Sequence, residues 1–168
     1  MKQTFIRLQV NSLAKKSKAI RSSISFEHAL SFGIVYTTDD KRKHDIVKDL
    51  CKQLEAKGKR VHVLTLLPEK KENFEFLFPY YTKKDFSFFG QLQSHDAEKF
   101  CAMPFDYLYC LDEVPQPMVL YILAKSKAKC RVGKYAEGME NFFELMVEEK
   151  GNVQQLKDNM LKYTAVLK

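Results

Sequence analysis

The sequence lacks any run of 18 or more apolar residues, so we expect no helix that crosses a membrane. Charged side chains interrupt its first residues, MKQTFIRLQVNSLAKKSK, too often for the apolar core of a secretory signal. Its four cysteines are widely spaced and form no CxxC pair, which argues against a zinc ribbon or a thioredoxin-type redox site. Together these absences predict a cytoplasmic protein whose thiols stay reduced.

Glycine-rich nucleotide-binding motifs are also missing. The turn expected after the first strand, TTDD at residues 37–40, has no glycine and two acids that would repel a pyrophosphate. There is no GxxxxGK(S/T) motif, and so no phosphate-cradling loop of the NTPase type. We therefore predict no bound cofactor.

The histidines and cysteines form no obvious reactive set. No two of the four histidines stand at i, i+4, so we predict no metal site. Cys110, at the expected end of a strand, is the best-placed thiol for a Cys–His pair. A cysteine there is more often a small buried apolar residue.

Apolar periodicity predicts alternating strands and helices in a chain of 168 residues, long enough for one packed domain. Strands are expected over residues 32–37, 60–67, 74–81, 105–111, 129–135 and 142–149. Helices are expected over residues 3–20, 45–59, 94–103 and 116–127, and after Gly151. Residues 38–45 are expected to form a turn, and residues 25–30 a short helical turn capped by Ser25.

A strand, a helix and a strand within about 35 residues form a βαβ unit with parallel strands. The predicted fold class is therefore α/β, a Rossmann-like three-layer sandwich. Its sheet has about five to six mostly parallel strands with helices on both faces.

In such a sheet, ligands bind at the carboxyl ends of the strands, near the point where the strand order reverses. Two loops qualify, TTDDK after the first strand and DEVPQP after the fourth, and we expect them to share one edge of the sheet. The candidate ligand-binding residues are Thr37, Thr38, Asp112, Glu113, Lys134 and Tyr135.

Asp39 and Asp40 are the candidate catalytic residues. Either could act as a general base, or the two could bind Mg²⁺ together with Asp112 and Glu113. The alternative is that one of them caps the following helix, where an acid complements the helix dipole.

The net charge of +7 is unevenly distributed. Residues 1–30 carry six basic side chains and one acid, whereas the rest of the chain is close to neutral. We therefore divide the chain into a basic helical leader, residues 1–24, and one Rossmann-like domain, residues 25–168. We expect the leader to be dispensable for folding. Its Lys15, Lys16, Lys18 and Arg21 could contact an anionic membrane or RNA, or could lie on a solvated helix face.

Aromatic side chains are concentrated in FEFLFPYYTKKDFSFFG, residues 74–90, together with Lys83 and Lys84. RNA-binding proteins use such a mixture for base stacking and phosphate contact. The alternative use is packing under a long loop.

Residues 105–135 resemble the N-terminal half of heptosyltransferase-type glycosyltransferases, which have the GT-B fold. The matching residues are Phe105-Asp106, Leu111-Asp112, Ala124, Ala128-Lys129 and Arg131-Val132-Gly133. The resemblance implies an Asp base after the first strand, where this chain has TTDD in place of a Gly-Asp step. It also implies that a second domain, here supplied by a partner, completes the active-site cleft.

A wider resemblance, over residues 30–165, is to a bacterial family of unknown function of about this length. The shared motifs are Gly33-Ile34, Gly58-Lys59-Arg60-Val61, DFSFFG at residues 85–90, residues 105–111, residues 126–128 with 132–135, and Leu145-Met146. This resemblance implies no activity.

From these patterns we expect a non-catalytic binding or interaction module that takes a protein partner or a small polar ligand at its strand-end loops. The alternatives are one half of a two-part glycosyltransferase-like enzyme with an Asp base, and an RNA-associated protein. A second copy of the chain is a further candidate partner.

Overall fold

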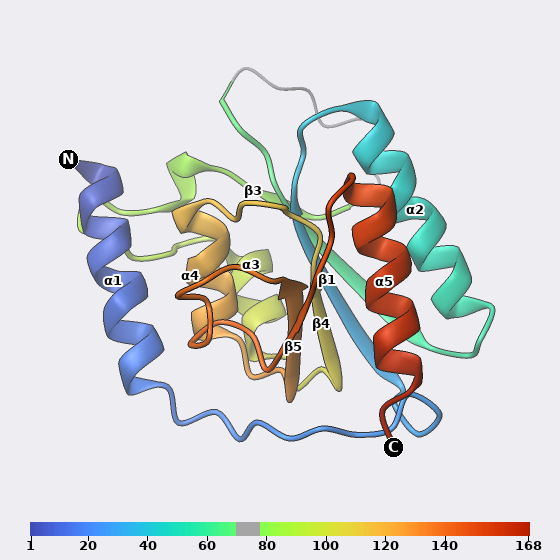
Figure 1. The fold of residues 1–168 in the computed structure, drawn as a ribbon. Coiled ribbons are helices and arrows are strands. Elements are labelled where there is room, and N and C mark those ends of the chain that lie inside the picture. The colour runs from blue at the N-terminus through green and yellow to red at the C-terminus, as the bar shows by residue number, and fades with distance from the viewer. Residues whose placement is uncertain (70–77) are drawn as a thin grey trace.

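The computed structural model describes residues 1–69 and 78–168, which contain a six-stranded sheet (Figure 1). The strand order is β3-β2-β1-β4-β5-β6, and each pair of neighbours is parallel. The strands are β1 (Ser31–Thr37), β2 (Arg60–Leu66), β3 (Tyr80–Tyr81), β4 (Tyr107–Cys110), β5 (Cys130–Lys134) and β6 (Leu145–Val147). The predicted Rossmann-like α/β fold is confirmed, with a sheet that is parallel throughout.

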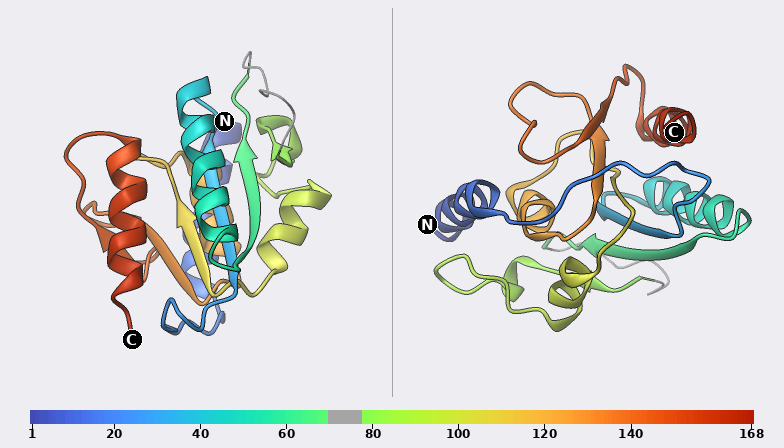
Figure 2. Two further views of the ribbon diagram at one scale, coloured as in Figure 1. Left: turned by 90° about the vertical axis from the view of Figure 1, so that its right-hand side faces the viewer. Right: turned by 90° about the horizontal axis from the view of Figure 1, so that it is seen from below.

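Helices cover both faces of the sheet (Figure 2). They are α1 (Lys2–Lys16), α2 (Lys41–Glu55), the 3₁₀ helix η2 (Lys83–Asp85), α3 (His95–Ala102), α4 (Pro117–Lys125) and α5 (Val153–Ala165). In the two described ranges, no helix is both long and apolar enough to cross a bilayer. The carboxyl ends of the strands, which we call the carboxyl edge, lie toward the top of Figure 1, and the amino edge lies toward the bottom.

Alternate side chains of the central strands enter two separate cores. On one face, α2 and α5 pack against Phe32, Tyr36 and Tyr109 of β1 and β4. On the other face, α3 and α4 pack against Val35 and Cys110 of the same two strands. The alternation follows from the two-residue period of a strand, and it leaves both faces of the sheet buried.

Helix α1 packs against α4 on the outside of the second face. Its Ile6 and Val10 are buried. Gly90, with a φ of +77°, approaches α1 so closely that a Cβ there would lie 2.6 Å from the Ile6 nitrogen. These contacts argue against the expectation that residues 1–24 are dispensable for folding. The stability of a chain without these residues would test that expectation.

Several predicted element boundaries are wrong. Residues 41–45, predicted as part of a turn, form the first turn of α2, because the Asp40 side chain accepts a hydrogen bond from the Lys43 amide and starts the helix there. Strand β6 has only three residues. Phe142 and Phe143, which were predicted to begin this strand, are instead buried in the connection that precedes it. By contrast, the short turn predicted over residues 25–30 with Ser25 as its cap is confirmed, because the Ala29 amide donates to the Ser25 carbonyl at 3.0 Å and the His28 amide donates to Ser25 Oγ at 3.4 Å. Of the strand predicted over residues 74–81, the structure shows Tyr80–Tyr81, and residues 74–77 lie outside the described ranges.

Candidate functional site

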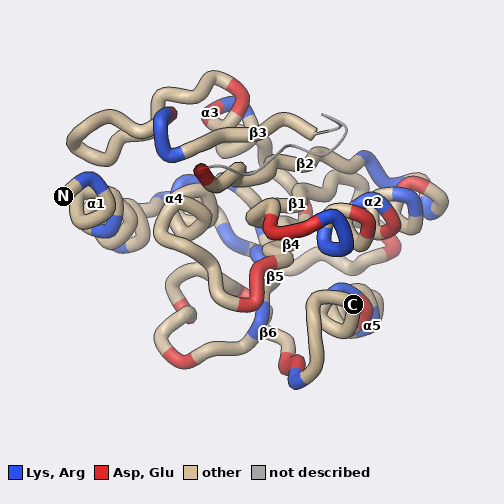
Figure 3. Tube along the Cα trace, turned by 90° about the horizontal axis from the view of Figure 1, so that it is seen from above, with Lys and Arg blue, Asp and Glu red and all other residues tan. Residues whose placement is uncertain are grey.

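The loops after β1 and β4 meet at the carboxyl edge, as predicted. Residues 32–35 of β1 pair in register with residues 107–110 of β4, and the strand order reverses between these two strands. Open α/β sheets bind their ligands at this switch point. Figure 3 looks down on this edge and shows acidic and basic segments side by side around the strand ends.

A buried carboxylate, Asp112, joins the two loops. Its side chain is 4 % exposed, and its oxygens accept hydrogen bonds from the Thr37 amide at 2.8 Å and from Thr37 Oγ1 at 2.6 Å. Lys43, in the first turn of α2, donates a third hydrogen bond at 2.6 Å. Thr37 and Asp112, both predicted to bind a ligand, are therefore bonded to each other inside the protein.

Lys43 was not predicted from the sequence, although it links both acidic loops. Its Nζ also donates to Asp39 Oδ2 at 2.7 Å. Burial alone would lower the pKa of Lys43, but the charge and hydrogen bond of Asp112, followed by those of Asp39, outweigh it and raise the pKa above its ordinary value. The available signal was the i, i+4 spacing of Asp39 and Lys43, which counts only once the helix is known to start at Lys41.

The two candidate catalytic acids have different roles. Asp40 is the N-cap of α2, which is the alternative that the sequence left open. The Asp39 side chain is 58 % exposed and forms an ion pair with Lys43. Across residues 1–69 and 78–168, no group of three or more His, Cys, Asp or Glu could hold a metal ion, so the alternative of a Mg²⁺ site built from Asp39, Asp40, Asp112 and Glu113 finds no such group there.

A second polar network occupies the ends of β1 and β2. The hydroxyl oxygens of Thr38 and Thr65 lie 2.7 Å apart, and Thr65 also donates to the Tyr36 carbonyl at 3.1 Å. The Tyr36 hydroxyl lies 3.0 Å from Nδ1 of His44. Burial raises the pKa of Tyr36 to about 12. Thr38, a predicted ligand-binding residue, is thus buried and bonded within the fold.

The remaining predicted ligand-binding residues lie around the end of β5. Lys134 Nζ is 3.2 Å from Glu149 Oε2 and 3.9 Å from Glu113 Oε2. The Glu149 side chain is 1 % exposed, and this residue was not predicted because the sixth strand was expected to run through it. Tyr135 is 54 % exposed, and its backbone amide donates to the Val147 carbonyl.

A crevice of about 240 Å³ opens between the first turns of α2 and α5. It is lined by Asp39, Asp40, Arg42, Lys43, Ile46, Glu113, Asn152, Val153 and Gln154. Of the predicted site residues, Asp39, Asp40 and Glu113 reach this space. The positive ends of two helix dipoles also meet there, so the crevice presents both signs of charge.

All four thiols are buried and free. Burial raises the pKa of Cys51 and Cys101 to about 12 and that of Cys130 to about 11, and it raises the pKa of Cys110 as well. Because the thiolate is the reactive form, these cysteines are inert near neutral pH. Of the two roles considered for Cys110, the structure supports that of a small buried apolar residue.

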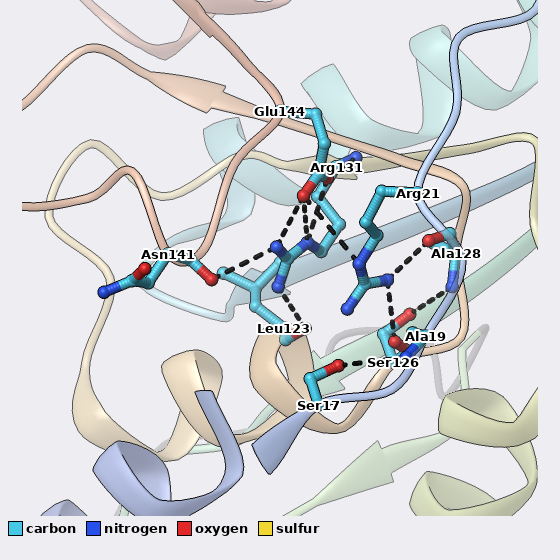
Figure 4. Close-up of polar contacts among 9 residues, drawn as sticks. All are labelled: Ser17, Ala19, Arg21, Leu123, Ser126, Ala128, Arg131, Asn141 and Glu144. Carbon is cyan, nitrogen blue, oxygen red and sulfur yellow. Dashed lines mark hydrogen bonds and ion pairs between the residues drawn. The ribbon is translucent and has the colours of Figure 1, made fainter. Parts of the chain in front are cut away.

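At the amino edge, Arg21 points into the protein (Figure 4). Its Nη1 donates to the carbonyl oxygens of Ser126, at 2.8 Å, and Ala128 in the connection between α4 and β5. Its Nε lies 3.8 Å from Glu144, which also binds Arg131 at 2.6 Å. Burial and then the charge of Arg131 lower the pKa of Arg21, and the charge of Glu144 opposes this effect.

The other predicted contacts to an anionic surface are exposed. Lys15 and Lys16 form the last turn of α1, and Lys18 follows it. Figure 3 shows α1 with basic segments and no acidic one. The four predicted contacts therefore divide into one arginine used within the fold and three lysines that face solvent.

The motifs behind the two resemblances hold structural positions. Asp106 accepts hydrogen bonds from the backbone amides of Leu30 and Ser31, at 2.9 and 3.1 Å, and so fixes the start of β1. Gly133 lies against the ring of Phe143, where a Cβ would come within 2.2 Å of Cζ. Packing and backbone hydrogen bonding explain these residues without any chemistry.

The DFSFFG segment is used for packing in the same way. Phe88 and Phe89 are exposed on one side, and their rings lie 5.6 and 5.9 Å from that of Phe5 in α1. Phe86 is buried beside Tyr121. Phe88 and Phe89 therefore attach α1 to the domain. Residues 74–77 of the predicted RNA-binding segment lie outside the described ranges.

A family model matches nearly the whole chain. Residues 2–167 match the model of a family of unknown function, DUF6913, and the matched range includes α1. No curated protein and no solved structure matches the chain.

Proposed function

The chain belongs to the family of unknown function DUF6913. From the geometry of its carboxyl edge, we propose that the protein is a non-catalytic module that binds a small polar ligand there. The crevice between α2 and α5 carries this proposal. Its volume of about 240 Å³ lies just below the roughly 300–1,000 Å³ of typical small-molecule sites. A small metabolite fits such a space, and a dinucleotide does not.

The charges around the crevice indicate the chemistry of the ligand. Asp39 and Glu113 present carboxylate oxygens, which accept hydrogen bonds from an ammonium group. Arg42 and the first turns of α2 and α5 favour an anionic group. A zwitterion with both groups, of the free amino acid type, satisfies the two kinds of wall together.

The partners of the polar side chains support a non-catalytic role. Asp112 and Lys43 bind each other, and Asp40 caps α2. The alternative, half of a transferase with Asp39 as its base, requires Lys43 to release Asp39 and a partner to bring the second domain. Binding of a protein partner at the carboxyl edge also remains a prediction, like the transferase alternative.

Thermal unfolding in the presence of each proteinogenic amino acid tests the proposal. A ligand at one hundred times its Kd stabilises the folded state by about 2.7 kcal/mol, which raises Tm measurably. The variants Arg42→Gln and Glu113→Gln should remove the rise. Their matched controls, Arg7→Gln and Glu27→Gln, change the same charges at exposed positions that do not line the crevice and should keep it.

Two results would contradict a zwitterion site. One is that no amino acid raises Tm. The other is that inorganic phosphate or putrescine, which each carry one sign of charge, raises Tm as much as any amino acid.

A further inference from the structure

A larger groove lies at the amino edge of the sheet, opposite the crevice. Its volume is about 600 Å³, within the range of natural ligand and contact sites. One wall is the end of α1 with the segment that follows it, and the other is the end of α4 with its connection to β5. The lining residues are Leu13, residues 16–20, Ser22, Pro104, Ala124, Lys125, Lys127 and Lys129. No acidic and no aromatic residue is among them.

Three lysines of this groove are available to an external anion. Lys125 binds Glu98 at 2.6 Å, and Lys129 binds Asp106 at 2.8 Å. Lys16, Lys18 and Lys127 are exposed and form no ion pair within residues 1–69 and 78–168. The first acidic residue of the chain is Glu27, so the segment after α1 supplies positive charge without compensation.

An exposed apolar side chain lies among these lysines. Ile20 is 84 % exposed, although it lines the groove next to Leu13 and Ala19. Leu30, which directly precedes β1 at the same edge, is 54 % exposed. Apolar side chains flanked by lysines are typical of surfaces that lie in a membrane interface.

The two walls of the groove are fastened to each other. The Ser22 amide donates to the Lys129 carbonyl at 3.0 Å, and Arg21 donates to the Ser126 and Ala128 carbonyls (Figure 4). The lysines of both walls are therefore held on one surface before any partner arrives.

We propose that this groove docks the protein on the surface of a bilayer that contains acidic phospholipids. Lys16, Lys18 and Lys127 contact the phosphate headgroups, and Ile20 enters the interface beside them. A bilayer fits better than RNA because the groove has no aromatic ring and no arginine on which bases could stack. The proposal is independent of the ligand at the carboxyl edge.

Vesicle sedimentation with the full chain tests this proposal. The vesicles are made of phosphatidylcholine, with or without phosphatidylglycerol, and binding is measured at low and high salt. We expect binding to the acidic vesicles at low salt and its loss at high salt, because exposed charges are screened. Vesicles without phosphatidylglycerol should leave the protein in the supernatant.

The decisive variant is Lys16→Gln/Lys18→Gln/Lys127→Gln. Each lysine near an acidic surface contributes roughly a fivefold change in partitioning, so the three together should weaken binding about a hundredfold. The control Lys52→Gln/Lys84→Gln/Lys150→Gln removes the same charge from exposed positions in other parts of the structure and should weaken binding less than about tenfold. Ile20→Ser should weaken binding about tenfold and leave its salt dependence unchanged.

Equal losses for the groove variant and the control variant would overturn the proposal, and so would wild-type protein that ignores acidic vesicles at low salt. Polyglutamate or single-stranded RNA, added as a competitor, separates the other occupants. If the wild type binds one of these polymers, the groove variant does not, and neither binds vesicles, the groove is a site for an acidic protein or for RNA. The proposed docking on a bilayer would then be refuted.

Discussion

The two edges of the sheet differ in how their charged side chains are partnered. At the carboxyl edge, Asp112, Lys43 and Asp39 form a chain of ion pairs that is buried at its centre. At the amino edge, Lys16 and Lys18 face solvent and form no ion pair with any residue that the structure describes. A buried charge must be paired because desolvation is costly, whereas an exposed charge need not be. The buried charges at the first edge, Asp112 and Lys43, therefore serve stability, whereas the exposed lysines at the second are available to an external partner.

The largest expected effect comes from removing residues 1–24, which deletes one wall of the amino edge. Burial of a large apolar side chain contributes about 1.5–3 kcal/mol, and both Ile6 and Val10 are buried. With the hydrogen bonds of Arg21 also lost, a chain that starts at Ser25 should be less stable by about 5 kcal/mol in urea unfolding. The control is Leu8→Gln, at an exposed position of α1, which should change stability by less than about 0.5 kcal/mol. Full stability of the truncated chain would restore the separable leader expected from the sequence.

Asp112→Ala tests the carboxyl edge, where removal of one buried charge should lower the free energy of unfolding. The change leaves the Lys43 ammonium buried and the Thr37 amide unsatisfied. Breaking a buried pair in this way lowers the free energy of unfolding by about 3–5 kcal/mol. Asp39→Asn, which removes the exposed partner of the same lysine, should lower it by less than about 1 kcal/mol. Similar losses for the two variants would mean that Asp112 is not the centre of the cluster.

Alkaline pH should weaken both edges together, because each has a buried thiol. Cys110 lies at the end of β4 and Cys130 at the start of β5, and burial raises both pKa values in the folded state. The unfolded thiols ionise near pH 8.5, so stability is complete below that pH and falls above it. The two thiols should together reduce the free energy of unfolding by roughly 4 kcal/mol at pH 10. The raised pKa of Lys43 acts in the same direction, since its ion pair is lost as the pH rises through that pKa.

The measurement for this pH dependence is urea unfolding between pH 7 and 10, with Cys130→Ala as the comparison. That variant should show a shallower fall with pH than the wild type. A free energy of unfolding that stays constant up to pH 10 would show that these thiols are as accessible in the folded state as in the unfolded one.

Arg21→Gln is expected to give the smallest of these effects. It removes the hydrogen bonds to the Ser126 and Ala128 carbonyls but also the repulsion from Arg131. Charged hydrogen bonds contribute about 1.5–3 kcal/mol each, and we expect a net loss of about 1–2 kcal/mol in thermal or urea unfolding. Arg7→Gln removes an exposed arginine from α1 and should be neutral within about 0.5 kcal/mol. If the two variants behave alike, Arg21 does not hold the walls of the groove together.

The sheet, and the meeting of the loops after β1 and β4 at one edge, could be predicted from local patterns. The apolar runs at residues 32–37 and 105–111 identified β1 and β4, and parallel connection then placed their loops at one edge. The partners within the site could not be predicted. Asp112 and Thr37 are 75 residues apart, and no local pattern reports their hydrogen bonds.

The packing of α1 was hidden for a similar reason. Its buried side chains Ile6 and Val10 are few among many polar residues, so the helix resembles a solvated one in sequence. Gly90, which permits its close approach, lies 84 residues after Ile6 in a segment without a clear period. The lysines at the end of the helix suggested an external charged contact. The position of α1 in the fold is instead held by its contacts with α4 and with the DFSFFG segment.

The shortness of the outermost strands has a consequence for association. Within the described residues, β3 at one side of the sheet has two residues and β6 at the other has three. An outermost strand offers its unpaired amides and carbonyls as a template to another chain, and strands this short offer very few. A second copy of the protein is therefore not expected to join by extending the sheet. The aromatic strands at the centre should stay protected from cross-β aggregation for as long as the molecule is folded.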